Sequence, residues 1–287
     1  MDAILSILFL GLAYAMILYV ISVGLSVTMG LMGFANLAHG VFAMAGGYVT
    51  VTLMNEHGVP FGPALALACV VVALASVVLE RALYARLYRA SELEQVLFTI
   101  GLIFMATAAA KYVFGPLPQP FREPEALQGR IRMLGGTFST YRVFIIAVGL
   151  ALIAGLWLGL ERTRIGAQIR AAVDNRRMAE SLGIDVGRLF TLAFALGSGL
   201  AALGGGLGAG IFAIEPGYAI EHLVYFLIVV AVGGLGSIRG PFFAALLLGI
   251  GDTACKYFVP ELGAFFIYLA VLALLLWRPG GLFGRVA

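Results

Sequence analysis

The chain has 287 residues, of which 62% are hydrophobic and 11% charged, with a formal net charge of +3 and a mean hydropathy of +1.03. Soluble domains carry about 25% charged residues, so this composition excludes a soluble globular fold and predicts an all-α, polytopic helical membrane protein. The low net charge and the lack of a dense basic run argue against a nucleic-acid partner. We expect a single transmembrane domain over residues 1–287.

Apolar runs follow one another along the whole chain, and a helical span needs about 20 apolar residues. We predict about eight to ten spans and place nine, at residues 5–29, 31–54, 62–84, 96–114, 142–160, 190–213, 222–236, 241–258 and 263–277. The first 30 residues hold no Lys or Arg, so we expect the first run to be a span and not a cleaved signal peptide. The seventh is short for a full crossing and is expected to be tilted or re-entrant.

The boundary between the first two predicted spans is rich in glycine and contains Asn36, His39 and Gly40. Since Asn36 and His39 are three residues apart, a helix would place them on one face. Polar groups at membrane depth are costly and normally face the protein interior or a pathway. Two interpretations stay open: these residues satisfy backbone groups freed at a helix break, or they line or gate a translocation path.

The loops differ in charge between the two sides of the membrane. One side carries twelve Lys or Arg residues and the other six, so the positive-inside rule makes the first side cytoplasmic. This places the N-terminus outside and the C-terminus in the cytoplasm. The longest outer loop, residues 115–141, holds prolines at 116, 118, 120 and 124, which prevent a regular helix. It is either a cap over the outer mouth or a plain connector.

The inner loop at about 161–189 is the densest charged segment, yet its apolar residues recur at helical spacing. Asp174 and Asn175 can cap a second helix, and Gly183 is a helix stop. The pattern predicts two short helices at the inner surface. They could be an amphipathic connector resting on lipid headgroups or a docking surface for a cytoplasmic partner. Two capped helices favour docking.

Two further glycine clusters have different expected roles. Gly204 and Gly208, and likewise Gly206 and Gly210, form GxxxG pairs that allow close helix packing. The run from Gly233 to Pro241 predicts a sharp turn at the inner face. No GxxxxGK[ST] occurs, so the chain is not expected to bind or hydrolyse ATP by a P-loop. No metal site is expected either.

Asp252 bears on two other classes of function, an intramembrane protease and a stand-alone transporter. Residues 249–252 have the GxGD form of intramembrane aspartyl proteases, but that chemistry needs two carboxylates and no second aspartate lies in a span. We therefore predict that the chain is not an enzyme. A stand-alone secondary transporter would use charged residues within spans for ion coupling. Asp252 and Lys256 are the obvious candidates, and an i, i+4 ion pair is the plainer interpretation.

Three segments together resemble a known family: GLMGFANLAHGVFAMAGGY (30–48), RTRIGAQIRAAVDNRRMAESLGID (162–185) and VGGLGSIRGPFFAALLLG (232–249). They are similar to the inner-membrane permeases of ABC importers for branched-chain amino acids, of the shorter, LivH-like type. The resemblance extends in order over nearly the whole chain. It implies a fold like that of type II ABC importers and a multi-pass protein of the bacterial inner membrane.

The resemblance also implies partners and a substrate class. Members pair with a second, related permease in a heterodimer, two cytoplasmic ATPase subunits bind the ATP, and a periplasmic binding protein delivers the substrate. The permease itself then needs no cofactor. The implied cargo is a branched-chain, hydrophobic amino acid. The same machine imports urea, short amides or aromatic acids in other members of this broad group, and that alternative stays open.

The resemblance suggests which residues carry the function. The segment from Ile165 to Gly183 matches the loop that couples the permease to the ATPase, and the candidate coupling residues are Gly166, Arg170, Asp174, Asn175, Glu180 and Gly183. The candidate residues of the translocation path or gate are Asn36, His39, Gly40, Gly233, Gly234 and Gly236. The basic pair at 176–177 departs from the family pattern and leaves the details of docking open.

Overall fold

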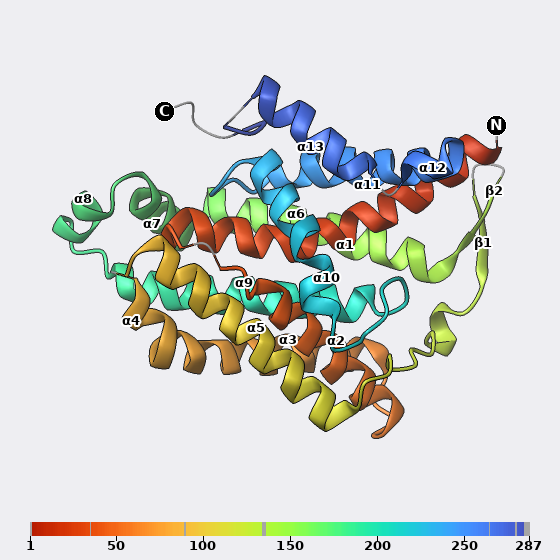
Figure 1. Cartoon of the computed structure of the whole chain (residues 1–287), viewed down its shortest axis with the longest axis horizontal. Coiled ribbons are helices and arrows are strands. Elements are labelled where there is room, and N and C mark those ends of the chain that lie inside the picture. Colours follow the sequence, from red (N-terminus) through yellow and green to blue (C-terminus); the bar gives the residue numbers. More distant parts are fainter. Residues whose placement is uncertain are drawn as a thin grey trace.

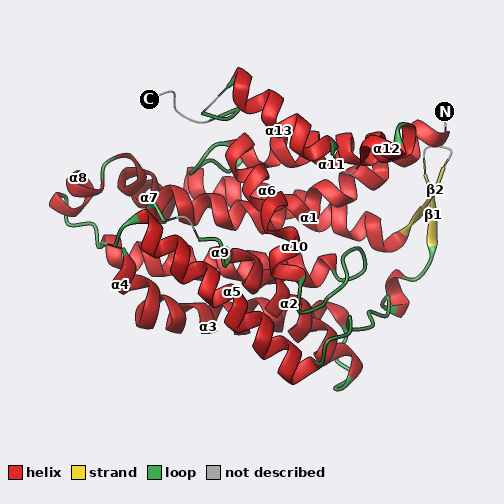
Figure 2. Ribbon diagram, viewed as in Figure 1, coloured by secondary structure: helices red, strands yellow, loops and turns green. Residues whose placement is uncertain are grey.

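The computed structural model describes residues 2–34, 36–88, 90–133, 136–263, 265–278 and 280–283. Within them the chain forms a helical bundle and one short β-hairpin (Figure 2). The elements are α1 (Asp2–Met32), α2 (His39–Asn55), α3 (Phe61–Leu79), the π-helix η1 (Glu80–Tyr84), α4 (Ala85–Leu87), α5 (Glu92–Phe114), the 3-10 helix η2 (Glu125–Leu127), β1 (Arg130–Met133), β2 (Gly136–Ser139), α6 (Thr140–Arg162), α7 (Arg164–Asp174), α8 (Arg176–Ser181), α9 (Val186–Gly208), α10 (Tyr218–Gly233), α11 (Arg239–Phe258), α12 (Pro260–Gly263) and α13 (Phe266–Trp277). Arg89 and Arg285, which entered the predicted charge count, lie outside the described residues.

The protein is a polytopic helical membrane protein, as its composition predicted. Five helices of the described part are long and apolar enough to cross a bilayer: α1, α3 with its continuation to Leu87, α5, α6 and α9. The other four predicted spans correspond to α2, α10, α11 and α13. Of these, α10 and α13 are apolar but shorter, with 16 and 12 residues, while α11 carries Arg239, Asp252 and Lys256. The apolar runs of the sequence therefore identified these helices. Helices α2, α10 and α13, however, are shorter than the length of about 20 residues that a full crossing needs.

The second predicted span begins in the wrong place. Residues 31–54 were expected to be one helix, but α1 continues to Met32 and ends at Gly33, whose φ of 62° lies in the left-handed region. Helix α2 then starts only at His39, whose Nε2 lies 2.9 Å from the carbonyl oxygen of Ile21. Ile21 is about three turns before the end of α1, so the chain turns back into the bundle before α2 begins. The prediction that Asn36 and His39 share a helical face is consequently wrong.

Helix α9 runs through the centre of the bundle and packs against α1, α2 and α3. Its glycines allow backbone contact: a Cβ atom added to Gly24 of α1 would lie 2.4 Å from the carbonyl oxygen of Gly197. The predicted close packing of this segment is confirmed. The predicted pair of Gly206 and Gly210 does not sit on one helix, however, because α9 ends at Gly208.

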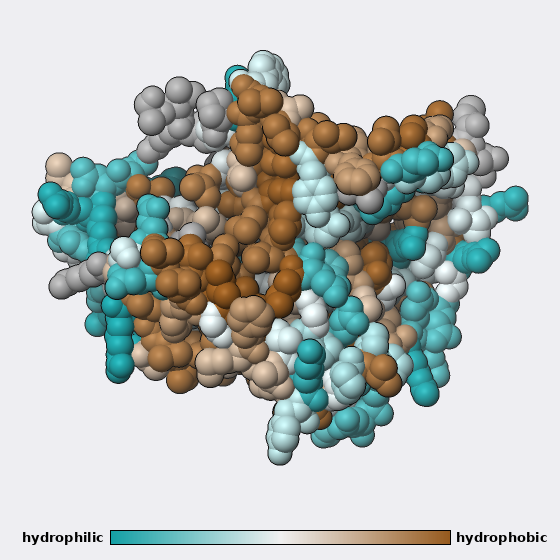
Figure 3. All heavy atoms as spheres, viewed as in Figure 1, coloured by the Kyte–Doolittle hydropathy of each residue, from teal (hydrophilic) through white to brown (hydrophobic). Residues whose placement is uncertain are grey.

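Different elements form the two ends of the bundle. At one end, hereafter the hairpin end, α1 begins and β1 pairs with β2 in antiparallel register, Arg130 opposite Ser139 (Figure 1). At the opposite end, hereafter the α7–α8 end, α1 finishes beside α7. Hydrophobic side chains gather over the middle of the face in Figure 3, between more hydrophilic regions at the two ends. The long axis of the bundle therefore runs roughly along the membrane normal.

Candidate functional site

The two short helices predicted for the inner loop are present and carry caps. The Thr163 hydroxyl accepts a 3.1 Å hydrogen bond from the Gly166 N–H at the start of α7. The Asn175 side-chain oxygen accepts a 3.0 Å bond from the Met178 N–H at the start of α8. Gly183 follows α8 with a φ of 80°, which only glycine adopts without strain. These local signals fold the segment as the sequence predicted.

One face of this helix pair is packed and the other is open. Ile169, Ala172 and Ala179 are buried in a small apolar cluster with residues from the end of α1 and the start of α9. Met178 and Leu182, by contrast, are 60% and 73% exposed. Glu180 forms an exposed ion pair with Arg176 over 2.9 Å. The segment is therefore fixed to the bundle on one side and presents apolar side chains on the other.

The turn between α10 and α11 packs backbone to backbone against the end of α1. Gly234 and Gly236 have φ values of 96° and 75°, so both positions favour glycine. A Cβ atom added to Gly30 of α1 would lie 2.2 Å from Cα of Gly236. The backbone N–H of Gly236 donates a 3.1 Å hydrogen bond to the Ser26 carbonyl oxygen, and the Ser26 hydroxyl donates a 2.9 Å bond to the carbonyl oxygen of Ser237. The turn is thus packed against the end of α1 and hydrogen-bonded to it.

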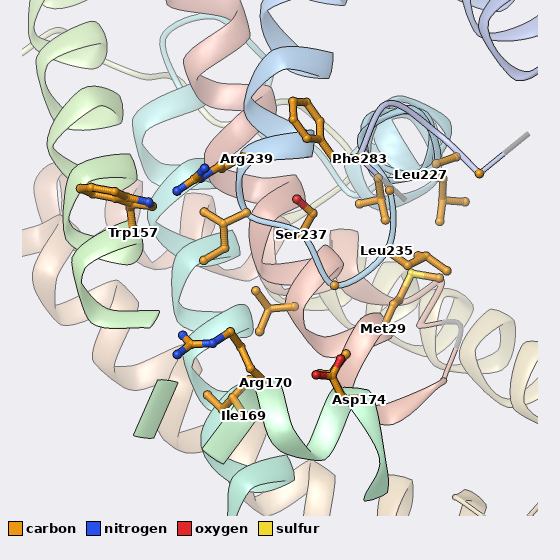
Figure 4. Close-up of a pocket in the computed structure, with 18 of the residues that line it drawn as sticks. Met29, Trp157, Ile169, Arg170, Asp174, Leu227, Leu235, Ser237, Arg239 and Phe283 are labelled. Carbon is orange, nitrogen blue, oxygen red and sulfur yellow. The ribbon is translucent and has the colours of Figure 1, made fainter. Parts of the chain in front are cut away.

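Helix α7 reaches this turn. A Cβ atom built on Gly236 would lie 3.6 Å from a methyl group of Val173. Arg170 and Asp174 line the same cavity as Gly234 and Gly236 (Figure 4). Two groups of predicted residues, one for coupling and one for the gate, are therefore neighbours in space although about 60 residues separate them. Their roles stay predictions.

Gly233, another predicted gate residue, ends α10 beside this turn, where a Cβ atom would lie 2.4 Å from the backbone nitrogen of Pro241. The predicted gate residues Asn36, His39 and Gly40 lie elsewhere, inside the bundle. The Tyr84 hydroxyl donates a 3.0 Å hydrogen bond to the side-chain oxygen of Asn36. A Cβ atom on Gly40 would lie 3.0 Å from the carbonyl oxygen of Ala219 on α10. Neither they nor His39 line the cavity at the turn. The His39 ring contacts the Ile21 carbonyl in the interior of α1, about three turns away from the break, so this contact does not decide between the two interpretations.

Sequence reasoning missed Glu80, the first residue of the π-helix η1. This carboxylate is only 2% exposed. It accepts hydrogen bonds from the Tyr88 hydroxyl and, over 2.9 Å, from the Thr191 hydroxyl of α9. Two features of the sequence could have identified Glu80. It lies at the end of an apolar run, and Tyr84 and Tyr88 follow it by four and eight residues, a spacing that places all three on one helical face. π-helical segments are frequent at functional sites.

Glu80 is also linked to α8. The Tyr88 ring packs edge-on against Phe190 at 5.3 Å between centroids, and the Arg176 guanidinium lies 5.0 Å from the centre of the same Phe190 ring. Glu80 therefore joins α3 and α9 at the point where α8 rests on the bundle.

Asp252 and Lys256 form the predicted ion pair, with 2.6 Å between Nζ and a carboxylate oxygen. The side chain of Asp252 is buried, whereas the side chain of Lys256 is exposed. This geometry matches the plain interpretation of an i, i+4 pair.

Comparisons with known proteins agree with this architecture. A family model described as branched-chain amino acid transport system / permease component matches residues 7–275. The chain is 28% identical to the permease protein BraD of the high-affinity branched-chain amino acid transport system of Pseudomonas aeruginosa, over 96% of this chain and 92% of that protein. It is 26% identical to LivH of Escherichia coli K12, with the same coverage. It is also 26% identical to LivM of Salmonella typhimurium, over 93% of this chain and 68% of LivM.

Proposed function

The chain belongs to the family of permease components of branched-chain amino acid transport systems, and on that premise we propose that it forms part of the translocation path of an ABC importer for leucine, isoleucine and valine. As a transport permease it supplies the membrane path, and the ATP is bound by partner subunits. The names of its relatives support this cargo over urea, amides or aromatic acids.

The observation that carries the mechanism is the contact between α7 and the glycine turn. Arg170, Val173 and Asp174 lie on one side of it, and Gly236 lies on the other. An ATPase subunit that docks on the exposed apolar side chains Met178 and Leu182 would move α7 when ATP closes the ATPase dimer. Because the turn is tied to the end of α1, the movement would reach the bundle. A ligand shifts such an equilibrium only through its differential affinity for the two states.

The remaining partners follow from the same arrangement. We propose two ATPase subunits at the α7–α8 end and a second, related permease beside this chain, as the similarity to both LivH and LivM suggests. The hairpin end would then receive a periplasmic binding protein. This puts the start of α1 outside the bacterial inner membrane. Leu282, whose N–H bonds the Val232 carbonyl near the glycine turn over 2.7 Å, would lie toward the cytoplasm.

The coupling proposal is tested with the double variant Arg170→Ala/Asp174→Ala, assembled with its ATPases and second permease in proteoliposomes. We expect ATPase stimulation by the leucine-loaded binding protein to fall by roughly tenfold or more, within the range of measured coupling energies. Leucine uptake should fall with it. Thermal unfolding of the purified permease should be nearly unchanged, because both residues are exposed.

The matched control is Arg81→Ala/Glu92→Ala, which removes the same two charges from exposed positions away from α7. Normal stimulation in the control and loss in the test variant support the proposal. Normal stimulation in both variants would show that α7 does not transmit the signal. Uptake of urea or benzoate, with leucine excluded, would instead contradict the cargo.

A further inference from the structure

A cavity of about 960 Å³ opens at the α7–α8 end, between the end of α1, α6, α7, α10, α13 and the segment after α13 (Figure 4). Most of its wall is apolar and includes Val27, Trp157, Leu227, Val230 and Leu275. The volume lies within the range of small-molecule sites, about 300–1,000 Å³. The site is thus large enough for a lipid headgroup and the first part of an acyl chain.

Among the described residues that line the cavity, the charged side chains are two arginines and one aspartate. Arg170 comes from α7 and Arg239 from the start of α11, and Figure 4 shows both side chains projecting toward the side where Trp157 lies. The Arg239 guanidinium lies 5.7 Å from the Trp157 ring centre. Guanidinium groups match phosphate oxygens with paired hydrogen bonds. The charge balance therefore favours an anion that also carries apolar groups.

The cavity sits where the apolar belt of the protein meets its charged end. On one side the exposed residues are apolar, with Leu276 and Trp277 of α13 at 80% and 74% exposure. On the other side lies α7 with its charged residues. Tryptophan is enriched at this level of a bilayer, and basic pockets between transmembrane helices bind anionic headgroups. The apolar wall is thus continuous with the surface that faces lipid.

We propose that this cavity binds an anionic phospholipid, with its phosphate between Arg170 and Arg239 and an acyl chain along Leu227, Val230 and Leu275. The bound lipid bridges α7 and α11, the two elements that flank the glycine turn. This inference requires that the protein is inserted in a membrane, but it requires neither the proposed cargo nor the ATPase docking. An experiment that contradicts those proposals would therefore leave it unaffected.

Tryptophan fluorescence can report lipid binding, because the chain contains two tryptophans, Trp157 in the cavity and Trp277 on the lipid-facing surface. The full-length variants Trp277→Phe and Trp157→Phe each keep one of them. Each is reconstituted into vesicles of constant phosphatidylglycerol and phosphatidylcholine content, with bromine on the chains of only one lipid. Bromine quenches the fluorescence of a tryptophan that touches the labelled lipid.

We expect Trp157 to be quenched preferentially by brominated phosphatidylglycerol and Trp277 to be quenched alike by both lipids. Each arginine near an anionic headgroup strengthens binding by roughly fivefold. Arg170→Gln or Arg239→Gln in the Trp277→Phe background should therefore lower the preference at Trp157 by about that factor. The same substitutions in the Trp157→Phe background should leave Trp277 quenching unchanged, which shows that the variants are inserted and folded.

Three results would overturn the proposal. Equal quenching of Trp157 by both lipids would show no anion preference. Protection of Trp157 from both lipids would show that protein covers the cavity. Loss of the preference on adding soluble glycerol phosphate would assign the arginines to a free phosphate ligand.

Discussion

Replacing Gly205 by alanine is expected to lower the free energy of unfolding by about 1–3 kcal/mol, the cost of forcing extra volume into a packed core. A Cβ atom at this position in α9 would lie 1.9 Å from the carbonyl oxygen of Ala43 on α2. The obstacle is backbone, so no side-chain rotation relieves it and the two helices must separate. Reversible unfolding in mixed micelles, or the melting temperature in detergent, measures the effect.

Gly155→Ala is the matched control for Gly205→Ala. Gly155 lies in α6, and a Cβ atom there would meet no atom within 4 Å. The substitution should be neutral or slightly stabilising, because alanine favours the helix over glycine by up to about 1 kcal/mol. Equal stability of the two variants would show that α2 and α9 are not in backbone contact.

Replacing Glu80 by alanine is expected to cost about 1–3 kcal/mol, because it leaves the half-buried hydroxyl group of Tyr88 without its acceptor and removes one of the two acceptors within reach of the Thr191 hydroxyl. Glu80→Gln keeps one side-chain oxygen and should cost less. We regard Glu80 as a positioning residue that holds the π-helix against α9. Thermal unfolding of the purified permease gives the order of stability, wild type above glutamine above alanine.

The same variants test whether Glu80 positions α8. Through Tyr88 and Phe190 the carboxylate contacts the ring on which Arg176 rests. We therefore expect Glu80→Ala to weaken ATPase stimulation by the loaded binding protein, and Glu80→Gln to restore most of it. Thr191→Val, which removes a single hydrogen bond, serves as the intermediate case. A glutamine variant as defective as alanine would indicate that the negative charge, and not the hydrogen bonds, matters.

Local features of the sequence accounted for much of the fold. The apolar runs identified the helices, since the cost of placing backbone and charge in hydrocarbon acts on every residue. The caps at Thr163 and Asn175 and the stop at Gly183 involve atoms only a few residues apart. Such signals are visible without knowledge of the neighbours. The presence of two short helices, the cap at Asn175 and the stop at Gly183 were therefore predicted, whereas the cap at Thr163 was not.

Part of the candidate site could be predicted and part could not. Arg170 and Asp174 were recognised as coupling candidates and Gly236 as a gate candidate, but nothing local predicts that they line one cavity. Asn36 was expected beside His39 on a helix and instead precedes α2. The depth at which a broken helix resumes depends on which partner carbonyl it meets, here that of Ile21.

The sequence by itself determined that this chain is a polytopic membrane permease with two capped helices between α6 and α9. Tertiary structure decided that Gly205 is a point of backbone contact between α2 and α9, that Glu80 is buried against α9, and that α7 meets the turn before α11. The physical reason is the range of the interactions. Hydropathy and capping act within one or two helical turns, whereas close packing and long-range hydrogen bonds here join residues separated by about 60 positions or more.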